Sequence, residues 1–231
     1  GERMVHEAER LPPMTDNVQR YARLEAGELH LGSGGQEFDL AQLVRETVQD
    51  WKGEFSRAGA ELQFHNAVLD DTRCSGDPQA IRALVGNLLS NARRYGVPED
   101  GDGRVEVRLG QWVEEAHWHW LPPRKTARRK GFILAVTDNG PGIARADQKR
   151  LFQPFARPEG SPTGGIGLGL SLVRRIAVAH GGRVRVEGPR KRGHRNRVGL
   201  HAGKTGVSFI VELPHPDRHP GIAPEPQGGQ P

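Results

Sequence analysis

The sequence has one cysteine in 231 residues and no long apolar run. A single thiol, Cys74, excludes an internal disulfide and fits a reducing compartment, so we expect it to pack rather than to act as a nucleophile. No stretch approaches the roughly 18 apolar residues of a membrane-spanning helix, and the N-terminus has no signal-peptide pattern. Only 35% of the residues are hydrophobic, against 31 glycines and 17 prolines, so we expect a folded core with long loops.

The net charge of +5 raises the question of a nucleic-acid partner. Much of the positive charge lies in two segments, residues 122–130 and 188–205, and tryptophans near the first could stack on bases. The favoured interpretation is that both segments are solvated loops and that the tryptophans pack on a sheet. Nucleic acid is therefore not the expected partner, although the role of the two loops stays open.

Two familiar phosphate-binding motifs are absent, because the chain has neither a P-loop GxxxxGK[ST] nor a GxGxxG after a first strand. Instead, a buried-strand pattern over residues 132–137 ends at Asp138 in the turn DNGPG. A second glycine cluster, residues 164–169, opens a helical pattern, and a helix N-terminus favours phosphate. Residues 143–163 between them are predicted to be mobile. An acidic turn, a lid and a phosphate cradle together predict a nucleotide site.

An earlier helix carries two asparagines. Asp77 followed by Pro78 is typical of a helix start. The apolar stripe that follows consists of Ile81, Leu84, Val85, Leu88 and Leu89. Asn87 and Asn91 lie four residues apart and so share a helix face. Amide oxygens suit the oxygen shell of Mg²⁺, so this face is a candidate metal site.

The remaining pattern predicts a helix over residues 40–58, with Asp39 as its cap, and several strands. The expected strands are residues 60–68, 104–109, 132–136, 183–186 and 206–213. The second and third form a long hairpin whose tip lies at the opposite end from Asp138. The last two form a closing antiparallel pair.

These segments closely resemble the ATP-binding domain of bacterial sensor histidine kinases, which are Bergerat-fold (GHKL) ATPases. Residues 87–95 match the N box of that family, 138–142 its G1 box, 151–157 its F box and 165–170 its G2 box. The resemblance covers roughly residues 76–182. It implies an α+β fold, a two-layer α/β sandwich with a mixed, mostly antiparallel sheet and helices on one face, preceded by one helix of a dimerisation hairpin.

The resemblance also implies roles for single residues. Asp138 would accept a hydrogen bond from the adenine amino group, and Asn91, supported by Asn87, would be the Mg²⁺ ligand. Arg157 would contact the γ-phosphate, so Asn91 and Arg157 are the catalytic candidates. The other nucleotide-binding candidates are Arg94, Tyr95, Gly140, Gly142, Ile143, Phe155, Gly165, Ile166, Gly167, Leu168, Gly169 and Leu170.

Several of these assignments carry a specific expectation. Gly140 and Gly142 would let the backbone pass close to the base, and the glycines of residues 165–169 would bring amides to the phosphates. Phe152 and Phe155 are expected to anchor the lid by packing. Arg94 stands where the family often has Lys, and an Arg forks differently on phosphate.

The expected domains are residues 1–31, the second helix of a dimerisation and phosphotransfer hairpin, residues 32–214, the catalytic domain, and residues 215–231, a disordered tail. Pro12 and Pro13 depart from a straight hairpin helix. No histidine, His6 included, lies in the phosphoacceptor pattern of the family. Because the chain also begins with Gly1, we expect a fragment that lacks its own phosphoacceptor.

The sequence is therefore interpreted as a protein histidine kinase domain that binds ATP and Mg²⁺. It would donate the γ-phosphoryl group to a histidine outside this chain, for relay to a response regulator. The full-length protein is expected to be a homodimer, with this portion cytoplasmic and with membrane attachment only through segments outside the sequence. Two alternatives stay open. One is an anti-sigma-type serine kinase of the same fold, which would not need the first helix. The other is a non-catalytic module that binds ATP or nucleic acid.

Overall fold

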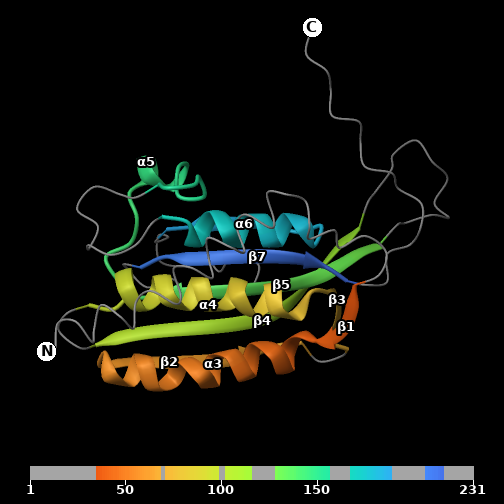
Figure 1. The fold of residues 1–231 in the computed structure, drawn as a ribbon, viewed down its shortest axis with the longest axis horizontal. Coiled ribbons are helices and arrows are strands. Elements are labelled where there is room, and N and C mark those ends of the chain that lie inside the picture. The colour runs from red at the N-terminus through yellow and green to blue at the C-terminus, as the bar shows by residue number, and fades with distance from the viewer. Residues whose placement is uncertain are drawn as a thin grey trace, which may run out of the picture.

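A five-stranded mixed sheet forms one layer of the protein, and helices form the other (Figure 1). The computed structural model describes residues 35–68, 71–98, 102–115, 128–156, 167–188 and 206–215. The strand order is β2 (Ala60–Asn66), β4 (Gly103–Glu115), β5 (Arg128–Asp138), β7 (Ser208–Pro214) and β6 (Arg183–Glu187). The pair β2–β4 is parallel and the other three pairs are antiparallel. The predicted α+β class is confirmed.

Three helices run along the sheet, namely α3 (Leu40–Arg57), α4 (Pro78–Tyr95) and α6 (Gly169–Ala179) (Figure 1). Their starts follow from the sequence. Asp39 Oδ1 accepts the N–H of Gln42 (2.9 Å) at the start of α3. Asp77 Oδ1 accepts the N–H groups of Gln79 (2.8 Å) and Ala80 (3.1 Å) at the start of α4, which satisfies donors that a helix leaves free. Both predicted caps are therefore confirmed.

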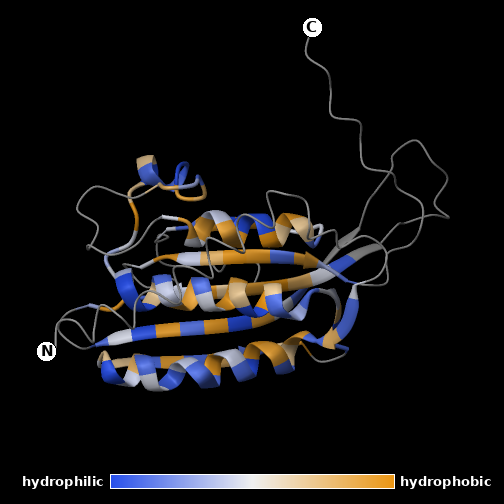
Figure 2. Cartoon of the chain, in the orientation of Figure 1, coloured by the Kyte–Doolittle hydropathy of each residue, from blue (hydrophilic) through white to orange (hydrophobic). Residues whose placement is uncertain are grey.

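The core lies between the helices and one face of the sheet. All five residues of the apolar stripe on α4 are fully buried, as the 3.6-residue period predicts. On the sheet, alternate residues of β4 and β5, such as Val107 and Leu134, face this core. Residues 132–138 are buried on both faces, because Ile133 and Ala135 join Ile210 in a small second cluster on the outer face. In Figure 2 the central strands accordingly carry long hydrophobic stretches.

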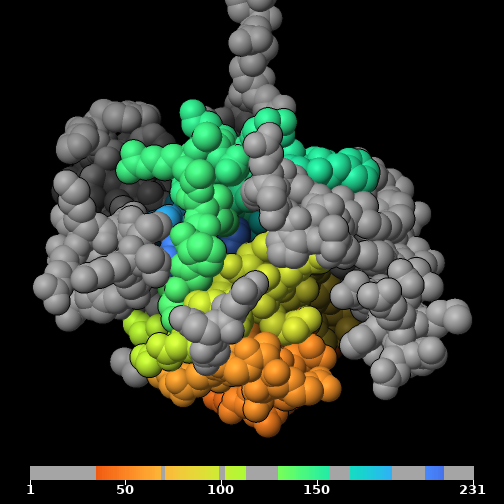
Figure 3. Space-filling model, turned by 90° about the vertical axis from the view of Figure 1, so that its left-hand side faces the viewer, coloured from red at the N-terminus to blue at the C-terminus, as the bar shows by residue number. Residues whose placement is uncertain are grey.

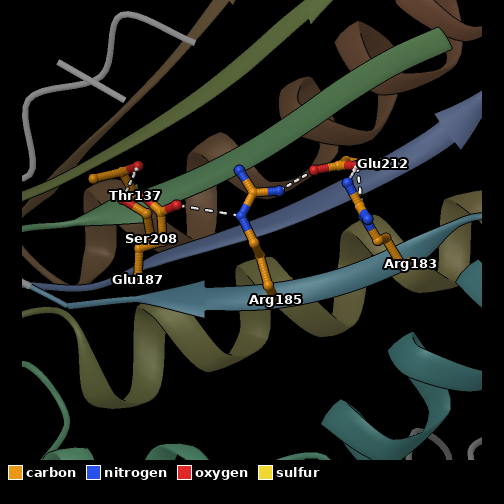
Figure 4. Close-up of polar contacts among 6 residues, drawn as sticks. All are labelled: Thr137, Arg183, Arg185, Glu187, Ser208 and Glu212. Atoms are coloured by element: carbon orange, nitrogen blue, oxygen red, sulfur yellow. Dashed lines mark hydrogen bonds and ion pairs between the residues drawn. The ribbon is translucent and has the colours of Figure 1, made fainter. Parts of the chain in front are cut away.

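The outer face of the sheet is joined by polar contacts between neighbouring strands (Figure 4). Glu212 on β7 pairs with Arg183 and Arg185 on β6, and Arg185 also contacts Glu187 (3.2 Å). Thr137 and Ser208 share a buried hydroxyl hydrogen bond of 2.8 Å between β5 and β7. That bond fixes the two strands together directly beside Asp138.

Two small elements differ from the sequence prediction. Strand β3 (Arg73–Gly76), which pairs with β1 (Gln36–Asp39) in a separate two-stranded sheet, was not predicted because its four residues show no apolar alternation. The segment expected only to be mobile contains a short helix, α5 (Arg145–Gln148). Cys74 of β3 is 2% exposed, and burial raises the pKa of its thiol to about 11, which confirms a packing role.

Trp112 of β4 packs against the outer cluster, as predicted for the tryptophans. The described residues do not include Trp118, Trp120 or most of both basic segments. The segment expected to form the hairpin helix and residues 216–231 also lie outside them. No helix in the described ranges is long and apolar enough to cross a membrane.

Candidate functional site

Asp138 is the last residue of β5 and its carboxylate is buried, with 5% of the residue exposed. Its Oδ1 accepts two backbone hydrogen bonds, from Gly140 N–H (3.0 Å) and from Val207 N–H (3.3 Å). Burial raises the pKa of this carboxyl to about 6, although both hydrogen bonds act in the opposite direction. Both of these bonds go to Oδ1, so within the described part of the chain Oδ2 is available to a ligand donor.

The turn after Asp138 packs directly on the C-terminal end of α4. A Cβ on Gly140 would lie 2.6 Å from Gly96 Cα, and a Cβ on Gly96 would lie 2.5 Å from Asp138 Cγ. Gly142 has φ +82°, a left-handed conformation that favours glycine. We expected Gly140 to let the backbone pass a base. The structure shows a further reason for glycine at positions 140 and 96, because a side chain at either position would push the turn away from α4.

The two asparagines of α4 approach the N-terminus of α6. Asn87 Nδ2 donates to the Ala83 carbonyl (2.8 Å), and Asn87 Oδ1 lies 3.0 Å from the point where a Cβ on Gly169 would stand. Asn91 Nδ2 is buried, and no hydrogen-bond partner for it occurs in the parts of the chain that are described. A buried amide with an unused donor is costly, so it indicates a group with a further role.

Among the residues that the structure describes, none caps the N-terminus of α6 with its side chain. Its N-cap residue, Leu168, is buried and makes no capping hydrogen bond, and Gly167 before it has φ +76°. Leu170 in the first turn packs against the core. The first N–H groups of α6 are therefore not used by a capping side chain, and the positive end of the helix dipole lies there, as an anion site requires.

The F-box segment is joined to the start of α6 through its backbone. Phe155 N–H donates to the Gly167 carbonyl (3.0 Å), and a Cβ on Gly167 would stand 2.8 Å from the Phe155 carbonyl carbon. Phe152 packs on the core with its ring edge-on to Phe209, as expected. The expectation for Phe155 was wrong, because its residue is 67% exposed and has φ +62°. Its backbone contact holds it in place, while its side chain is mostly exposed.

The other predicted residues lie around the same end of α4. Tyr95 is its last residue and is partly exposed, and the Arg94 guanidinium carbon lies 5.6 Å from the Tyr95 ring centroid. Ile143 is half-buried against the core. Arg157, Gly165 and Ile166 lie outside the described residues.

The acidic turn, the asparagine face and the start of α6 therefore converge at one end of the α4–α6 pair. In Figure 3, which views that end, the surface is hollowed between α4 and the segment that carries α5. An open cavity of about 490 Å³ lies on the outer face of the sheet and reaches this site, because Thr137, Asp138 and Asn139 belong to its lining. Its lining is mostly polar and charged, with Glu61, Glu106 and Arg104 among the residues. We assign the chemistry to the first location, because only there do the uncapped helix and the asparagines meet Asp138.

Sequence reasoning missed the contacts of three residues at the site. Gly206 and Val207 contact Asp138 through their backbones, and a Cβ on Gly206 would stand 2.0 Å from the Asp138 carbonyl oxygen. Asn139 bonds to the start of β4. None of these contacts had a local signal in the sequence, because each partner is 35 or more residues away.

The chain is similar to known proteins in sequence and in fold. The profile of the family described as histidine kinase-, DNA gyrase B- and HSP90-like ATPase matches residues 76–217. Sensor protein ChvG of Rhizobium meliloti is 33% identical over 217 residues, which is 90% of this chain and 33% of ChvG. Sensor-like histidine kinase SenX3 of Mycolicibacterium smegmatis is 29% identical over 223 residues, covering 95% of this chain and 49% of SenX3. The chain thus spans between a third and a half of the length of these two relatives.

Solved structures show the same fold. The nucleotide-free catalytic domain of histidine kinase ThkA superposes with a TM-score of 0.55 at 25% identity, over 78% of this chain and 95% of that one. The mycobacterial sensor histidine kinase MprB gives a TM-score of 0.56 at 24% identity, over 78% and 97% of the two chains.

Proposed function

Because the chain belongs to the family of histidine kinase-, DNA gyrase B- and HSP90-like ATPases, we propose that it binds ATP with Mg²⁺ where α4, α6 and Asp138 meet. Its relatives are sensor histidine kinases, and its fold is that of their catalytic domains. The observation that carries the proposal is the meeting of a buried carboxylate, an asparagine face and an uncapped helix N-terminus at one place. We assign the catalytic domain to residues 32–214 and a hairpin helix to residues 1–31.

The carboxylate of Asp138 gives the site its preference for a purine with an amino group. Its Oδ1 is held by two backbone N–H groups, and Oδ2 accepts the hydrogen bond from the adenine amino group. A charge-assisted hydrogen bond in a buried setting is stronger than one in water. A guanine presents a carbonyl oxygen at the same position, which would repel the carboxylate.

The phosphates lie at the start of α6, where N–H groups and the helix dipole meet negative charge. The residues present fit a magnesium ion, because Mg²⁺ takes oxygen ligands, Asn87 directs its amide oxygen toward the start of α6, and Asn91 carries a second amide oxygen on the same helix face. Asn91 with support from Asn87 would hold the ion, which supplies charge neutralisation to the phosphates when bound. Arg157 contacts the γ-phosphate, and Arg94 adds positive charge near the same end of α4.

The reaction is an in-line transfer of the γ-phosphoryl group to a histidine outside this chain. An imidazole nitrogen attacks the γ-phosphorus, the bond to the bridging oxygen breaks, and ADP leaves with that electron pair. A carboxylate of a response regulator then takes the phosphoryl group and releases the imidazole. ThkA has been solved in complex with response regulator protein TrrA, which supports this class of partner. We further assign a homodimer and a membrane anchor to the full-length protein, in line with its resemblance to sensor histidine kinases.

The test is a titration of the full chain with a non-hydrolysable ATP analogue, AMPPNP, with and without Mg²⁺. Asp138→Asn and Asn91→Ala are compared with Asn66→Ala, whose side chain caps the far end of β2 by accepting Val68 N–H (3.0 Å). We expect binding that Mg²⁺ strengthens, with losses in the first two variants and none in the third. Failure of the unaltered chain to bind AMPPNP with Mg²⁺ would refute the proposal.

A further inference from the structure

Asn139 joins the turn that carries Asp138 to the start of β4 through three hydrogen bonds. Its Oδ1 accepts Arg104 N–H (2.7 Å), its Nδ2 donates to the Asp102 carbonyl (2.8 Å), and its own N–H donates to the Arg104 carbonyl (3.2 Å). An N–H can only donate and a carbonyl can only accept. The two backbone partners of the side chain therefore fix which way the Asn139 amide points.

These bonds stand where the strand pairing ends. The last paired residues of β4 and β5 are Val105 and Asp138, and Asn139 is the first residue after β5. Asn139 N–H still donates to the Arg104 carbonyl, and the Asn139 side chain accepts Arg104 N–H in place of a backbone carbonyl. Its amide nitrogen also donates to the Asp102 carbonyl. The peptide units that follow Asp138 are fixed by contacts to a different strand rather than by the turn alone.

The position of those peptide units decides where the Asp138 carboxylate points. Asp138 Oδ1 accepts two hydrogen bonds, and the shorter one comes from the N–H of Gly140, the residue after Asn139. If the peptides around Asn139 rotated, Gly140 N–H would turn away and the carboxylate would be held only by Val207 N–H at 3.3 Å. Gly140 would also lose its close approach to Gly96 on α4.

We propose that Asn139 is a positioning residue for base selection, which holds the Asp138 carboxylate in the one orientation that distinguishes adenine from guanine. The inference rests on the proposed function, because it takes the base to lie at Asp138. A merely structural role predicts something different. A variant that only lowers the folded fraction reduces the binding of every nucleotide equally, so the ratio of two affinities measured on one sample stays constant.

The experiment measures the dissociation constants of AMPPNP and GMPPNP with Mg²⁺ for the full chain. It uses the unaltered chain, Asn139→Ala, Asn139→Asp, Asp138→Asn and the matched control Asn66→Ala, which removes one side-chain bond to the backbone at a distant strand end. We expect the preference for AMPPNP to fall about tenfold in Asn139→Ala, the value of one misdirected hydrogen bond to a charged group. Asn66→Ala keeps the preference of the unaltered chain.

Asn139→Asp refines the result, because aspartate keeps the acceptor for Arg104 N–H but faces the Asp102 carbonyl oxygen with a second acceptor. We expect a loss of preference comparable to that of Asn139→Ala, and this variant also serves if the alanine variant does not fold. An unchanged preference in the Asn139 variants, together with a reduced preference in Asp138→Asn, would overturn the inference and leave the proposed function intact. If the unaltered chain bound neither analogue, the proposed function would fail and this inference with it.

Discussion

His180 Nε2 accepts a hydrogen bond from the backbone N–H of Asp77 at 3.1 Å, which joins the end of α6 to the start of α4. The same ring contacts the Ile176 carbonyl through Nδ1 (2.7 Å), so Nδ1 carries the proton and Nε2 is an acceptor. A Cβ on Gly76 would stand 2.3 Å from this ring, which leaves no room for another residue there. The contact lies at the opposite end of the helix pair from Asn87 and Gly169. It therefore helps to set the spacing at which those two residues meet.

We predict that the His180 contact makes the fold sensitive to acid. Burial lowers the pKa of His180, while the Ile176 carbonyl and nearby Asp77 act in the opposite direction. The unfolded chain then binds more protons, so the stability from this ring is complete above the ordinary histidine pKa of about 6.5 and is lost as the pH falls below it. His180→Phe keeps an aromatic ring without titration. It should cost about 1–3 kcal/mol at pH 7.5, because Asp77 N–H loses its acceptor.

Urea denaturation of the full chain at pH 7.5 and pH 5.5 measures this effect. The difference in unfolding free energy between the unaltered chain and His180→Phe should shrink at the lower pH. An equal difference at both pH values would mean that folding leaves the pKa of this ring unchanged, which would contradict the prediction.

We predict that Asp138→Asn stabilises the nucleotide-free protein while it weakens nucleotide binding. The folded carboxyl has a pKa of about 6, above its ordinary value of 3.8, so the folded state binds more protons between those values. Stability is therefore lost as the pH rises through this window, the opposite sign to His180. An asparagine keeps an oxygen for Gly140 N–H and carries no charge. It should gain about 2–3 kcal/mol at pH 7.5.

The control for this prediction is the pH. At pH 4 the Asp138 carboxyl of the unaltered chain is mostly protonated in the folded protein, so little of the cost of burying its charge remains. Urea denaturation at pH 4 should therefore show little difference between the two proteins. In the same variant, AMPPNP affinity at pH 7.5 should fall by at least about tenfold, since a charge-assisted hydrogen bond is lost. A variant that is less stable at pH 7.5 would contradict the prediction and would show that the hydrogen bonds of the carboxylate outweigh the cost of burying it.

The sequence predicted those parts of the site that depend on residues close together in the chain. Asp77 before Pro78 marked a helix start, and a four-residue spacing placed Asn87 and Asn91 on one face, because helix geometry depends on neighbours in the chain. Asn139 lies within residues 138–142, which the sequence analysis matched to the G1 box. Its contacts could not be predicted, because they are set by the register of β4 on β5, which joins residues 35 positions apart.

The error at Phe155 has a related cause. An aromatic residue in an apolar segment suggests packing, and Phe152 does pack. Phe155 instead has a backbone in the left-handed region, held by the Gly167 carbonyl, and this directs its ring to solvent. A strained conformation of this kind depends on partners far along the chain and leaves no mark on local composition.

We predict that Asn91→Ala separates metal binding from stability. The Asn91 amide contains a buried nitrogen without a hydrogen bond among the described residues, so its removal relieves a desolvation cost that offsets the lost packing. The unfolding free energy should change by less than about 1 kcal/mol. The strengthening of AMPPNP binding by Mg²⁺ should be largely lost. Ser90→Ala, an exposed neighbour on the same helix, is the control that keeps both properties. If Mg²⁺ strengthened binding equally in all three proteins, Asn91 would have no part in holding the metal.

We predict that alanine has opposite effects at two glycines. At Gly140 a Cβ would lie 2.6 Å from the Gly96 backbone, which belongs to the end of α4 and cannot move aside as a side-chain tip could. Gly140→Ala should push the turn away from α4, at a cost of about 1–3 kcal/mol in unfolding free energy. It should also weaken AMPPNP binding by more than the unfolded fraction explains, because Asp138 moves with the turn.

Gly53 in α3 is the matched control, since a Cβ there meets no atom within 4 Å. Gly53→Ala should stabilise the protein by about 0.5–1 kcal/mol, because alanine loses less backbone entropy in a helix. Urea denaturation and AMPPNP titration of both variants test the pair. Normal AMPPNP binding by folded Gly140→Ala would show that Asp138 does not depend on the close packing of its turn against Gly96, and that this contact serves stability alone.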